Sequence, residues 1–339
     1  MRTNRGIPLN RAGLLNPFVD YLGRMGAPVE RNLEREGLPI HALENPDTLI
    51  SARRHMSFVG SMRWSQGIED LGWRVAQQAE TGPIGTELRH AIVKSPTLYE
   101  ALLAVCSLVR RESTQTDMWM TESAGAVHLF HRGTFVPGTP GQDELSLWRV
   151  RTLLAIIRLF AGKDWTPDEA CFALAKDPGV VVREALRDCR IYRAPDCGWI
   201  TIPRSILSQA PPQPIRAPVD SKDSRVVRNH SADLVASLKQ LLRPYLYEAV
   251  PKVDEAAAMA GLHRRTFQRR LREAQVSYRD VVRQTRFEAA KRILEDPTNR
   301  IMDVAHEVGF DDFSHFSRVF RSIAGGTPTE FRRSLNSGP

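Results

Sequence analysis

Basic side chains that could bind an anion are concentrated in one short segment, residues 263–274. Five of its twelve residues are arginine: Arg264, Arg265, Arg269, Arg270 and Arg272. A guanidinium group can donate two parallel hydrogen bonds to the edge of guanine or to a phosphate. If this segment is a helix, one side of it is apolar and buried, and the opposite side is polar and exposed. The apolar side consists of Phe267, Leu271 and Ala274. That polar side would carry Arg264, Arg265, Gln268, Arg269 and Arg272, a set suited to reading DNA.

A second segment, residues 313–323, has the same two-sided character. A helical period puts one apolar side together, formed by Phe313, Phe316, Val319, Phe320 and Ile323. The opposite side carries Ser314, Ser317, Arg318 and Arg321. Serine can hydrogen-bond to a base or to a phosphate, and arginine can do either more strongly. The pattern predicts a second DNA-contacting helix.

The two segments belong to an internal repeat. Residues 253–262 (VDEAAAMAGL) match residues 301–310 (IMDVAHEVGF) at an offset of 48, with Gly261 matching Gly309. After one inserted residue, Arg269 matches Arg318. Each unit is a short amphipathic helix, a turn in which glycine can take a positive φ, and a second helix. The repeat therefore predicts two helix-turn-helix units.

A long helix is predicted to join these units. Ser277 and Asp280 have the spacing of a capping box, apolar positions recur from Val281 to Leu294, and Asp296-Pro297 ends the pattern. About 18 residues at 1.5 Å per residue give about 27 Å. Successive major grooves lie about 34 Å apart on one face of B-DNA, so the helix could place the two recognition helices in successive major grooves.

Catalytic and metal-binding patterns are missing. The sequence lacks G-x-S-x-G, H-E-x-x-H and S-x-x-K motifs. Gly133 and Gly138 have phosphate-loop spacing, but Thr139 stands where that loop needs lysine. The four cysteines form no C-x-x-C pair and have no histidine at zinc spacing; reduced thiols are the simplest reading, and a redox pair of Cys189 and Cys197 is a remote alternative. We expect no enzyme activity, no metal and no cofactor.

Length and charge distribution divide the chain. A length of 339 residues favours two domains. Residues 1–220 have a net charge of +2, and residues 221–339, with 21 Lys and Arg against 15 Asp and Glu, have +6. Such asymmetry is typical of contact with nucleic acid or membrane. No apolar run is long enough to span a bilayer, and the N-terminal residues lack the apolar core of a signal peptide, so we expect a cytoplasmic protein.

The N-terminal part is predicted to be an α+β domain over residues 1–208, with helices plus a small sheet. Predicted helices span 14–25, 29–36, 55–65, 68–79, 84–93, 97–111, 144–160 and 181–187. Alternating residues predict a hairpin of strands 116–121 and 126–131, and further strands at 169–175 and 199–202. A proline-rich linker, 209–222, precedes an all-α domain, 223–339, which holds the two helix-turn-helix units.

A small-molecule pocket is predicted beside the hairpin and the apolar helix that follows it. Its candidate wall residues are Trp119, His128, Phe130, His131 and Trp148. For any one of them, an ordinary core or rim position is the commoner alternative. Arg149 and Arg151 could meet a carboxylate, although a solvated helix face is the simpler interpretation.

Residues 250–333 resemble the DNA-binding domain of the AraC/XylS family of bacterial transcription regulators. The resemblance is carried by AAAMAGLHRRTFQRRLREAQVSYRDVVRQTRFEAAKRIL and by IMDVAHEVGFDDFSHFSRVFRSIAGGTPTEFRR. It implies that Arg265, Gln268 and Arg269 reach bases in one groove, and that Ser314, His315 and Arg318 do so in the next. Arg264, Arg272 and Arg321 would contact phosphates. His315 falls off the polar side, and Asp311-Asp312 departs from the pattern because carboxylates repel phosphates while suiting a helix N-terminus.

The N-terminal part is similar to the effector-binding domain of ornithine-utilisation and related regulators. The similar stretches are RAGLLNPFVDYLGRMGAPVERNLEREGLP, SPTLYEALLAVCSLVR and WTPDEACFALAKDP. Such domains are implied to bind a small effector, here an amino acid, an amine or a fatty acid, and to form a homodimer.

The leading hypothesis is an effector-responsive activator of a catabolic or virulence-type operon. Its partners would be double-stranded operator DNA, RNA polymerase and the effector, with no membrane. One alternative is a constitutive DNA-binding protein whose N-terminal domain only dimerises. Another is an enzyme with an appended DNA-binding domain, which the missing catalytic residues make remote.

Overall fold

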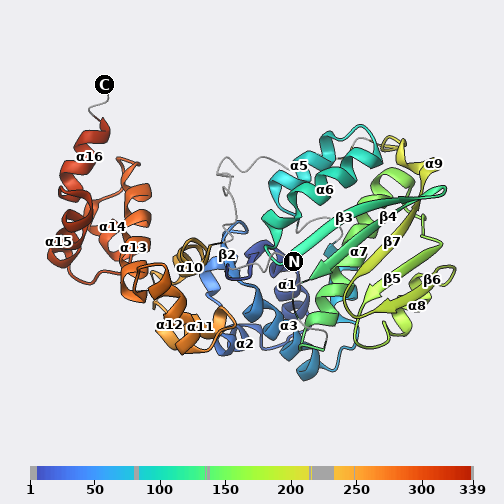
Figure 1. Ribbon diagram of the computed structural model, residues 1–339, viewed down its shortest axis with the longest axis horizontal. Coiled ribbons are helices and arrows are strands. Elements are labelled where there is room, and N and C mark those ends of the chain that lie inside the picture. The colour runs from blue at the N-terminus through green and yellow to red at the C-terminus, as the bar shows by residue number, and fades with distance from the viewer. Residues whose placement is uncertain are drawn as a thin grey trace. The chain divides into compact units, whose positions relative to one another are not determined.

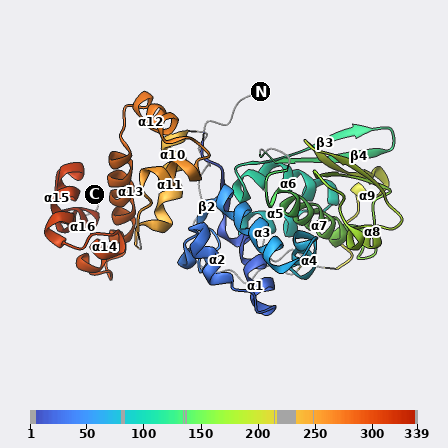
Figure 2. The same cartoon turned by 90° about the horizontal axis from the view of Figure 1, so that it is seen from below.

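The chain forms two compact units, which we describe separately (Figures 1 and 2). The computed structural model describes residues 6–79, 84–133, 135, 138–213, 215, 233–247 and 249–336. One unit is Pro8–His230, and the other is Ser231–Pro339 together with Met1–Ile7. Residues 214 and 216–222 of the predicted linker lie outside the described residues. Within the described part, no helix has the length and apolar character needed to cross a bilayer.

A five-stranded sheet organises the N-terminal unit, in the order β3-β4-β7-β5-β6. Neighbouring strands are antiparallel except for the parallel pair β5 and β6. The strands are β3 Thr116–Ser123, β4 Ala126–Gly133, β5 Glu169–Ala173, β6 Arg190–Ala194 and β7 Gly198–Pro203. The predicted hairpin is confirmed as β3 and β4, in which Trp119 pairs with Phe130.

Helices pack against the inner face of this sheet and form one of two cores. Leu129 of β4 and Ile200 of β7 are fully buried against side chains of α5, α6 and α7. The second core joins α1 to α4, and Phe18 and Phe58 are its largest fully buried side chains. The helices are α1 Asn16–Arg24, α2 Val29–Glu36, α3 Ala52–Gln66, α4 Leu71–Ala79, α5 Thr86–Lys94, α6 Leu98–Glu112, α7 Gln142–Ala161, α8 Val180–Ala185 and α9 Arg204–Leu207. The predicted α+β class is confirmed.

Several short elements were not predicted. A two-stranded antiparallel sheet joins β1 (Leu9–Arg11) and β2 (Leu49–Ser51), and strand β6 lies at the edge of the main sheet. Three residues are too few to show alternation, and β6 (RIYRA) is polar because most of its side chains are exposed. A 3-10 turn at Ala12–Leu14 precedes α1, and another at Ile40–Leu43 follows α2 and precedes β2.

The C-terminal unit is all helical and repeats itself. Its helices are α10 Leu234–Leu242, α11 Val253–Met259, α12 Arg264–Glu273, α13 Tyr278–Leu294, α14 Ile301–Glu307, α15 Phe313–Ala324 and α16 Pro328–Asn336, with a 3-10 turn at Arg243–Tyr245. The first helices of the two units start 48 residues apart and the second helices 49 apart, as the repeat with one insertion predicts. Gly261 and Gly309 both have a positive φ.

Aromatic side chains hold the second helix-turn-helix unit together. Phe316 and Phe320 of α15 are buried with their ring centroids 5.8 Å apart. Phe320 also contacts Phe287 of α13, with centroids 4.9 Å apart, and Phe331 of α16, at 5.6 Å. These contacts fix α15 on α13 and leave its polar side facing outward.

Replacing Gly309 by alanine is expected to lower the free energy of unfolding of this unit by about 2 kcal/mol. Its φ of 80° is unfavourable for alanine, and a Cβ there would lie 2.2 Å from the carbonyl oxygen of Leu246. Urea unfolding followed by circular dichroism measures the loss.

Gly325→Ala is the matched control for Gly309→Ala. Gly325 has a φ of 79°, but nothing lies within 4 Å of a Cβ built there. Only the backbone cost remains, so we expect a loss of about 1 kcal/mol. Equal losses for the two variants would contradict the predicted clash with Leu246.

Candidate functional site

Helix α12 presents a row of exposed arginines. Arg264, Arg265, Arg269 and Arg272 are exposed, Gln268 and Arg270 are half-buried, and Phe267 and Leu271 are buried. The predicted polar side therefore faces outward. Ala274 is exposed at the C-terminus of the helix, so its predicted burial is wrong. The helix ends there, and no neighbouring element covers that last position.

Two of these arginines form ion pairs with carboxylates of the same helix-turn-helix unit. Arg264 Nη1 lies 3.1 Å from an Asp254 oxygen, and Arg269 Nε lies 3.6 Å from a Glu273 oxygen. All four side chains are more than half exposed. Exposed ion pairs of this kind contribute about 0–1 kcal/mol, so a phosphate or a base edge can replace the carboxylate at little cost.

Helix α15 exposes Ser314, His315, Arg318 and Arg321. The helical period predicts His315 off the polar side, yet its side chain is exposed. The His315 and Phe310 rings meet edge to face, with their centroids 5.4 Å apart. Phe313 is 42% exposed, so its predicted burial is wrong. Both residues lie in the first turn, where the preceding loop leaves the helix uncovered.

The N-termini of the two recognition helices differ. Asp312 caps α15, because its carboxylate accepts a hydrogen bond from the backbone N–H of His315 at 2.9 Å. This bond lowers the pKa of Asp312 below its ordinary value. His263 stands at the matching position before α12, and its side chain makes no capping hydrogen bond. The backbone N–H groups at the start of α12 are therefore without a side-chain cap, whereas a carboxylate occupies those of α15.

Helix α13 spans 17 residues, which gives about 26 Å. The predicted capping box is confirmed: Ser277 Oγ accepts from the N–H of Asp280 at 3.2 Å, and the Ser277 N–H donates to Asp280 Oδ2 at 3.0 Å. Its C-terminal half packs on α14 and α15 through Ala290 and Leu294. The connection between the two helix-turn-helix units is thus a single unbroken helix.

The five predicted effector residues lie on different sides of the N-terminal sheet. His128 and Phe130 alternate along β4 with buried Leu129 and His131, so they face the outer side. There Trp119 stacks on Phe130 at 5.3 Å, and His128 contacts Trp199 edge-on at the same separation. His131 points to the inner side and is fully buried.

The inner side has a cavity of about 80 Å³ between α5, α6, α7 and β3. Apolar side chains form most of its lining, among them Ile84, Leu88, Val105, Leu153 and Ile156. Its polar lining residues include Asn10, His55, Glu112, Gln115, Trp148 and Arg149. Of the predicted effector residues, Trp148 alone lines this cavity. Arg149 is buried rather than solvated, because the helix that carries it packs on both cores.

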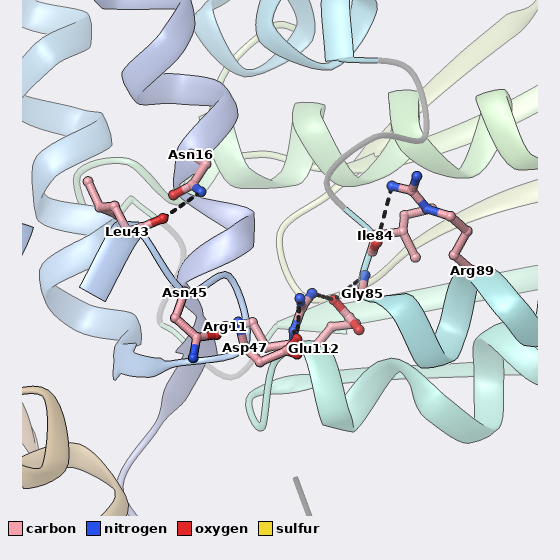
Figure 3. A network of polar contacts seen from close by, with 9 residues as sticks. All are labelled: Arg11, Asn16, Leu43, Asn45, Asp47, Ile84, Gly85, Arg89 and Glu112. Atoms are coloured by element: carbon pink, nitrogen blue, oxygen red, sulfur yellow. Dashed lines mark hydrogen bonds and ion pairs between the residues drawn. The ribbon is translucent and has the colours of Figure 1, made fainter. Parts of the chain in front are cut away.

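Glu112, which lines the cavity, belongs to an ionic network (Figure 3). Arg11 Nη1 lies 2.6 Å from Glu112 Oε2, and Arg11 Nη2 lies 2.6 Å from Asp47 Oδ1. Glu112 also accepts the backbone N–H of Gly85 at 3.1 Å. Arg11 also lines a second, larger cavity of about 430 Å³. Burial raises the pKa of Glu112 even though Arg11 stabilises its charge.

No metal site is formed by the described residues, where no three of the His, Cys, Asp and Glu side chains come together. Each of the four cysteines, all within those residues, is a free thiol.

Two family models match the chain. Residues 256–334 match a helix-turn-helix domain. Residues 26–210, more than half of the chain, match the N-terminal arabinose-binding domain of AraC transcription regulators.

The matches to curated relatives cover only part of each chain. The transcriptional activator NphR of Rhodococcus is 32% identical over 104 residues, which are 31% of each chain. The transcriptional activator RhaR of Yersinia pseudotuberculosis is 40% identical over 58 residues, 17% of this chain and 20% of its own. The chain thus spans about a third or less of these relatives. The crystal structure of the transcriptional regulator CdpR from Pseudomonas aeruginosa is 17% identical, with a TM-score of 0.42 over 95% of this chain and 98% of that one.

Proposed function

The chain belongs to the AraC family of transcription regulators, and from this we propose that it is an effector-responsive, DNA-binding activator. One observation carries the proposal: two helix-turn-helix units, each with an outward-facing polar recognition helix, are joined by one continuous helix. The family consists of regulators, not enzymes. The two named activators among the relatives favour activation. The target would be a catabolic or virulence-type operon, with RNA polymerase as a partner.

We assign the DNA contacts by position on the two recognition helices. Arg265, Gln268 and Arg269 of α12 would reach bases in one major groove, and Ser314, His315 and Arg318 of α15 would do so in the next. Arg264, Arg272 and Arg321 would contact phosphates. The exposed guanidinium groups and the length of α13 support this arrangement.

The N-terminal unit would bind the effector and form a homodimer. Its sequence supports a domain of the ornithine-utilisation type, and the matching family model adds a sugar to the amino acids, amines and fatty acids that the sequence suggested. An effector acts only if it binds the DNA-competent arrangement more tightly than the other. We place this function in the cytoplasm, where operator DNA is accessible.

Arg269→Ala is expected to weaken binding to an operator about 10- to 100-fold and to change binding to random DNA much less. The reason is that a bidentate contact to a base edge is available only at the correct sequence. The operator is first selected from random-sequence DNA with the wild-type protein, and affinities are then measured by gel shift at fixed salt.

Arg292→Ala is the matched control, because Arg292 is an exposed arginine on α13, outside the recognition helices. It removes the same charge and should leave operator affinity within about twofold. Equal losses of Arg269→Ala on operator and random DNA would make Arg269 a phosphate contact. Failure of the wild-type protein to enrich any sequence would overturn sequence-specific DNA binding.

A constitutive DNA-binding protein with a purely dimerising N-terminal unit is the second candidate. Thermal unfolding separates the two, because a ligand that binds only the folded state raises the melting temperature. A rise with at least one amino acid, amine, sugar or carboxylic acid supports the effector role.

A further inference from the structure

Arg149 is a buried charge of the N-terminal unit whose hydrogen bonds are incomplete. It lies on α7, is 8% exposed and lines the 80 Å³ cavity. Its Nη1 has no hydrogen-bond partner among the described residues. Burial lowers its pKa to about 10, and none of the described carboxylates raises it again. At neutral pH the side chain therefore remains a buried cation that no described carboxylate neutralises.

Neighbouring groups do not supply the missing anion. Glu112 also lines the cavity, but it is already paired with Arg11 at 2.6 Å. His55 and His131 are neutral, since burial lowers the pKa of each to about 3. A buried charge without a partner is strongly unfavourable, which favours an anion that comes from outside the chain.

The same cavity has further polar atoms without partners. They are Asn10 Oδ1, His55 Nε2, Gln115 Oε1 and Trp148 Nε1, each buried and each without a hydrogen bond within the described part of the chain. Trp148 can only donate, as Arg149 does, and a carboxylate accepts from both. Buried polar atoms are normally satisfied, so a cluster of five in one cavity indicates a ligand.

Size and lining restrict that ligand further. At about 10–15 Å³ per water molecule, a cavity of about 80 Å³ has room for roughly five to eight waters. Covalently bonded atoms lie closer together than separate waters do, so this corresponds to a molecule of about six to nine non-hydrogen atoms. A long-chain fatty acid is too large. An amine is a cation at neutral pH and is repelled by Arg149. The ammonium group of an amino acid would meet only the neutral amide oxygens of Asn10 and Gln115, and no unpaired carboxylate among the described residues.

We propose that this cavity is the effector site and that it takes a small monocarboxylate with an apolar body, held by Arg149 and Trp148. The assignment rests on the proposed effector role of the N-terminal unit. The apolar body would lie among Leu88, Val105 and Ile156, and the carboxylate would complete the hydrogen bonds of Arg149.

The test measures ligand binding to the full chain without DNA. Pentanoate and benzoate are titrated by calorimetry and thermal unfolding beside pentanamide and benzamide, which have the same shape and no charge. We expect at least one acid to bind at least tenfold more tightly than its amide. Arg149→Met should weaken binding of that acid about 10- to 100-fold and leave the amide unchanged.

Two further variants keep the result interpretable. Arg149→Lys retains the charge without the planar fork, so we expect an intermediate loss, and it replaces Arg149→Met if that variant does not fold. Arg158→Met is the matched control, because Arg158 lies on the same helix, is half-buried and donates to the carbonyl of Trp165 instead of lining the cavity. It should bind the acid as the wild type does.

Three outcomes would overturn the site: no acid of the series binds, acids and amides bind equally, or Arg149→Met binds the acid normally. Operator binding is measured separately and without ligand. Its failure would refute the proposed regulator, whereas intact operator binding with no acid binding would refute the site alone.

Discussion

Arg11→Met is expected to lower the free energy of unfolding of the N-terminal unit by about 3–5 kcal/mol at pH 7. Arg11 is 6% exposed and neutralises two carboxylates, those of Glu112 and Asp47 (Figure 3). Without it, Glu112 is a buried charge whose remaining bond is to the Gly85 N–H. Breaking one side of a buried pair costs far more than the pair itself contributes.

Acid pH distinguishes this mechanism from a simple packing loss. Burial already raises the pKa of Glu112, and removing Arg11 must raise it further. The variant should therefore recover part of its stability between pH 7 and pH 5, as Glu112 takes up a proton. The double variant Arg11→Met/Glu112→Gln should recover a similar part at pH 7. A loss that is the same at both pH values and in the double variant would contradict the charge explanation.

The N-terminal unit is also expected to lose about 3 kcal/mol of stability as the pH rises from about 4.5 to 7, because of Glu144. This carboxyl is 2% exposed on α7, and burial raises its pKa from 4.5 to about 7. The N–H of Gly72 at 2.8 Å and Arg63 at 2.8 Å reduce the rise without cancelling it.

The sign follows from proton binding. Between pH 4.5 and 7 the folded protein holds more protons at Glu144 than the unfolded chain does, so raising the pH favours unfolding. The stabilising contribution is complete below about pH 4.5 and is lost once the pH passes about 7. Denaturant unfolding at a series of pH values measures it.

Glu144→Gln supplies the comparison, because an amide keeps the acceptor for Gly72 and does not titrate in this range. The difference between wild type and variant isolates Glu144 from the surface carboxylates, which titrate in both proteins. A difference that does not change between pH 4.5 and 7 would contradict the raised pKa of Glu144.

The two helix-turn-helix units and the helix that joins them could be predicted closely from the sequence, whereas α10 was not predicted. The 48-residue repeat, Gly261 and Gly309, and the Ser277–Asp280 capping box are local signals, and each determines a helix end or a turn. The errors, Ala274 and Phe313, lie in the first or last turn of a recognition helix. Burial at a helix end depends on what covers it, and a helical period contains no information about that.

The cavity could not be predicted in the same way. Asn10, His55, Glu112 and Arg149 are far apart in the sequence and meet only because β1, α3, α6 and α7 pack together. Arg149 follows Trp148 in a helix with other arginines, where a solvated side chain is the ordinary expectation. The hairpin aromatics had a clear local pattern, but alternation along β4 turns His128 and Phe130 away from the cavity. Which face of the sheet is covered by helices depends on tertiary packing, and alternation along one strand contains no information about it.

Because the N-termini of α12 and α15 differ, the two helix-turn-helix units are expected to contribute unequally to DNA binding. The uncapped start of α12 can accept a DNA phosphate on its backbone N–H groups, whereas the carboxylate of Asp312 already occupies that place on α15. We therefore expect the contact under α12 to supply more of the affinity, because backbone N–H groups would hold a phosphate there in addition to the side-chain contacts with bases. The contact under α15 would depend on side chains alone. Most of the binding energy at an operator would then come from one of its two half-sites.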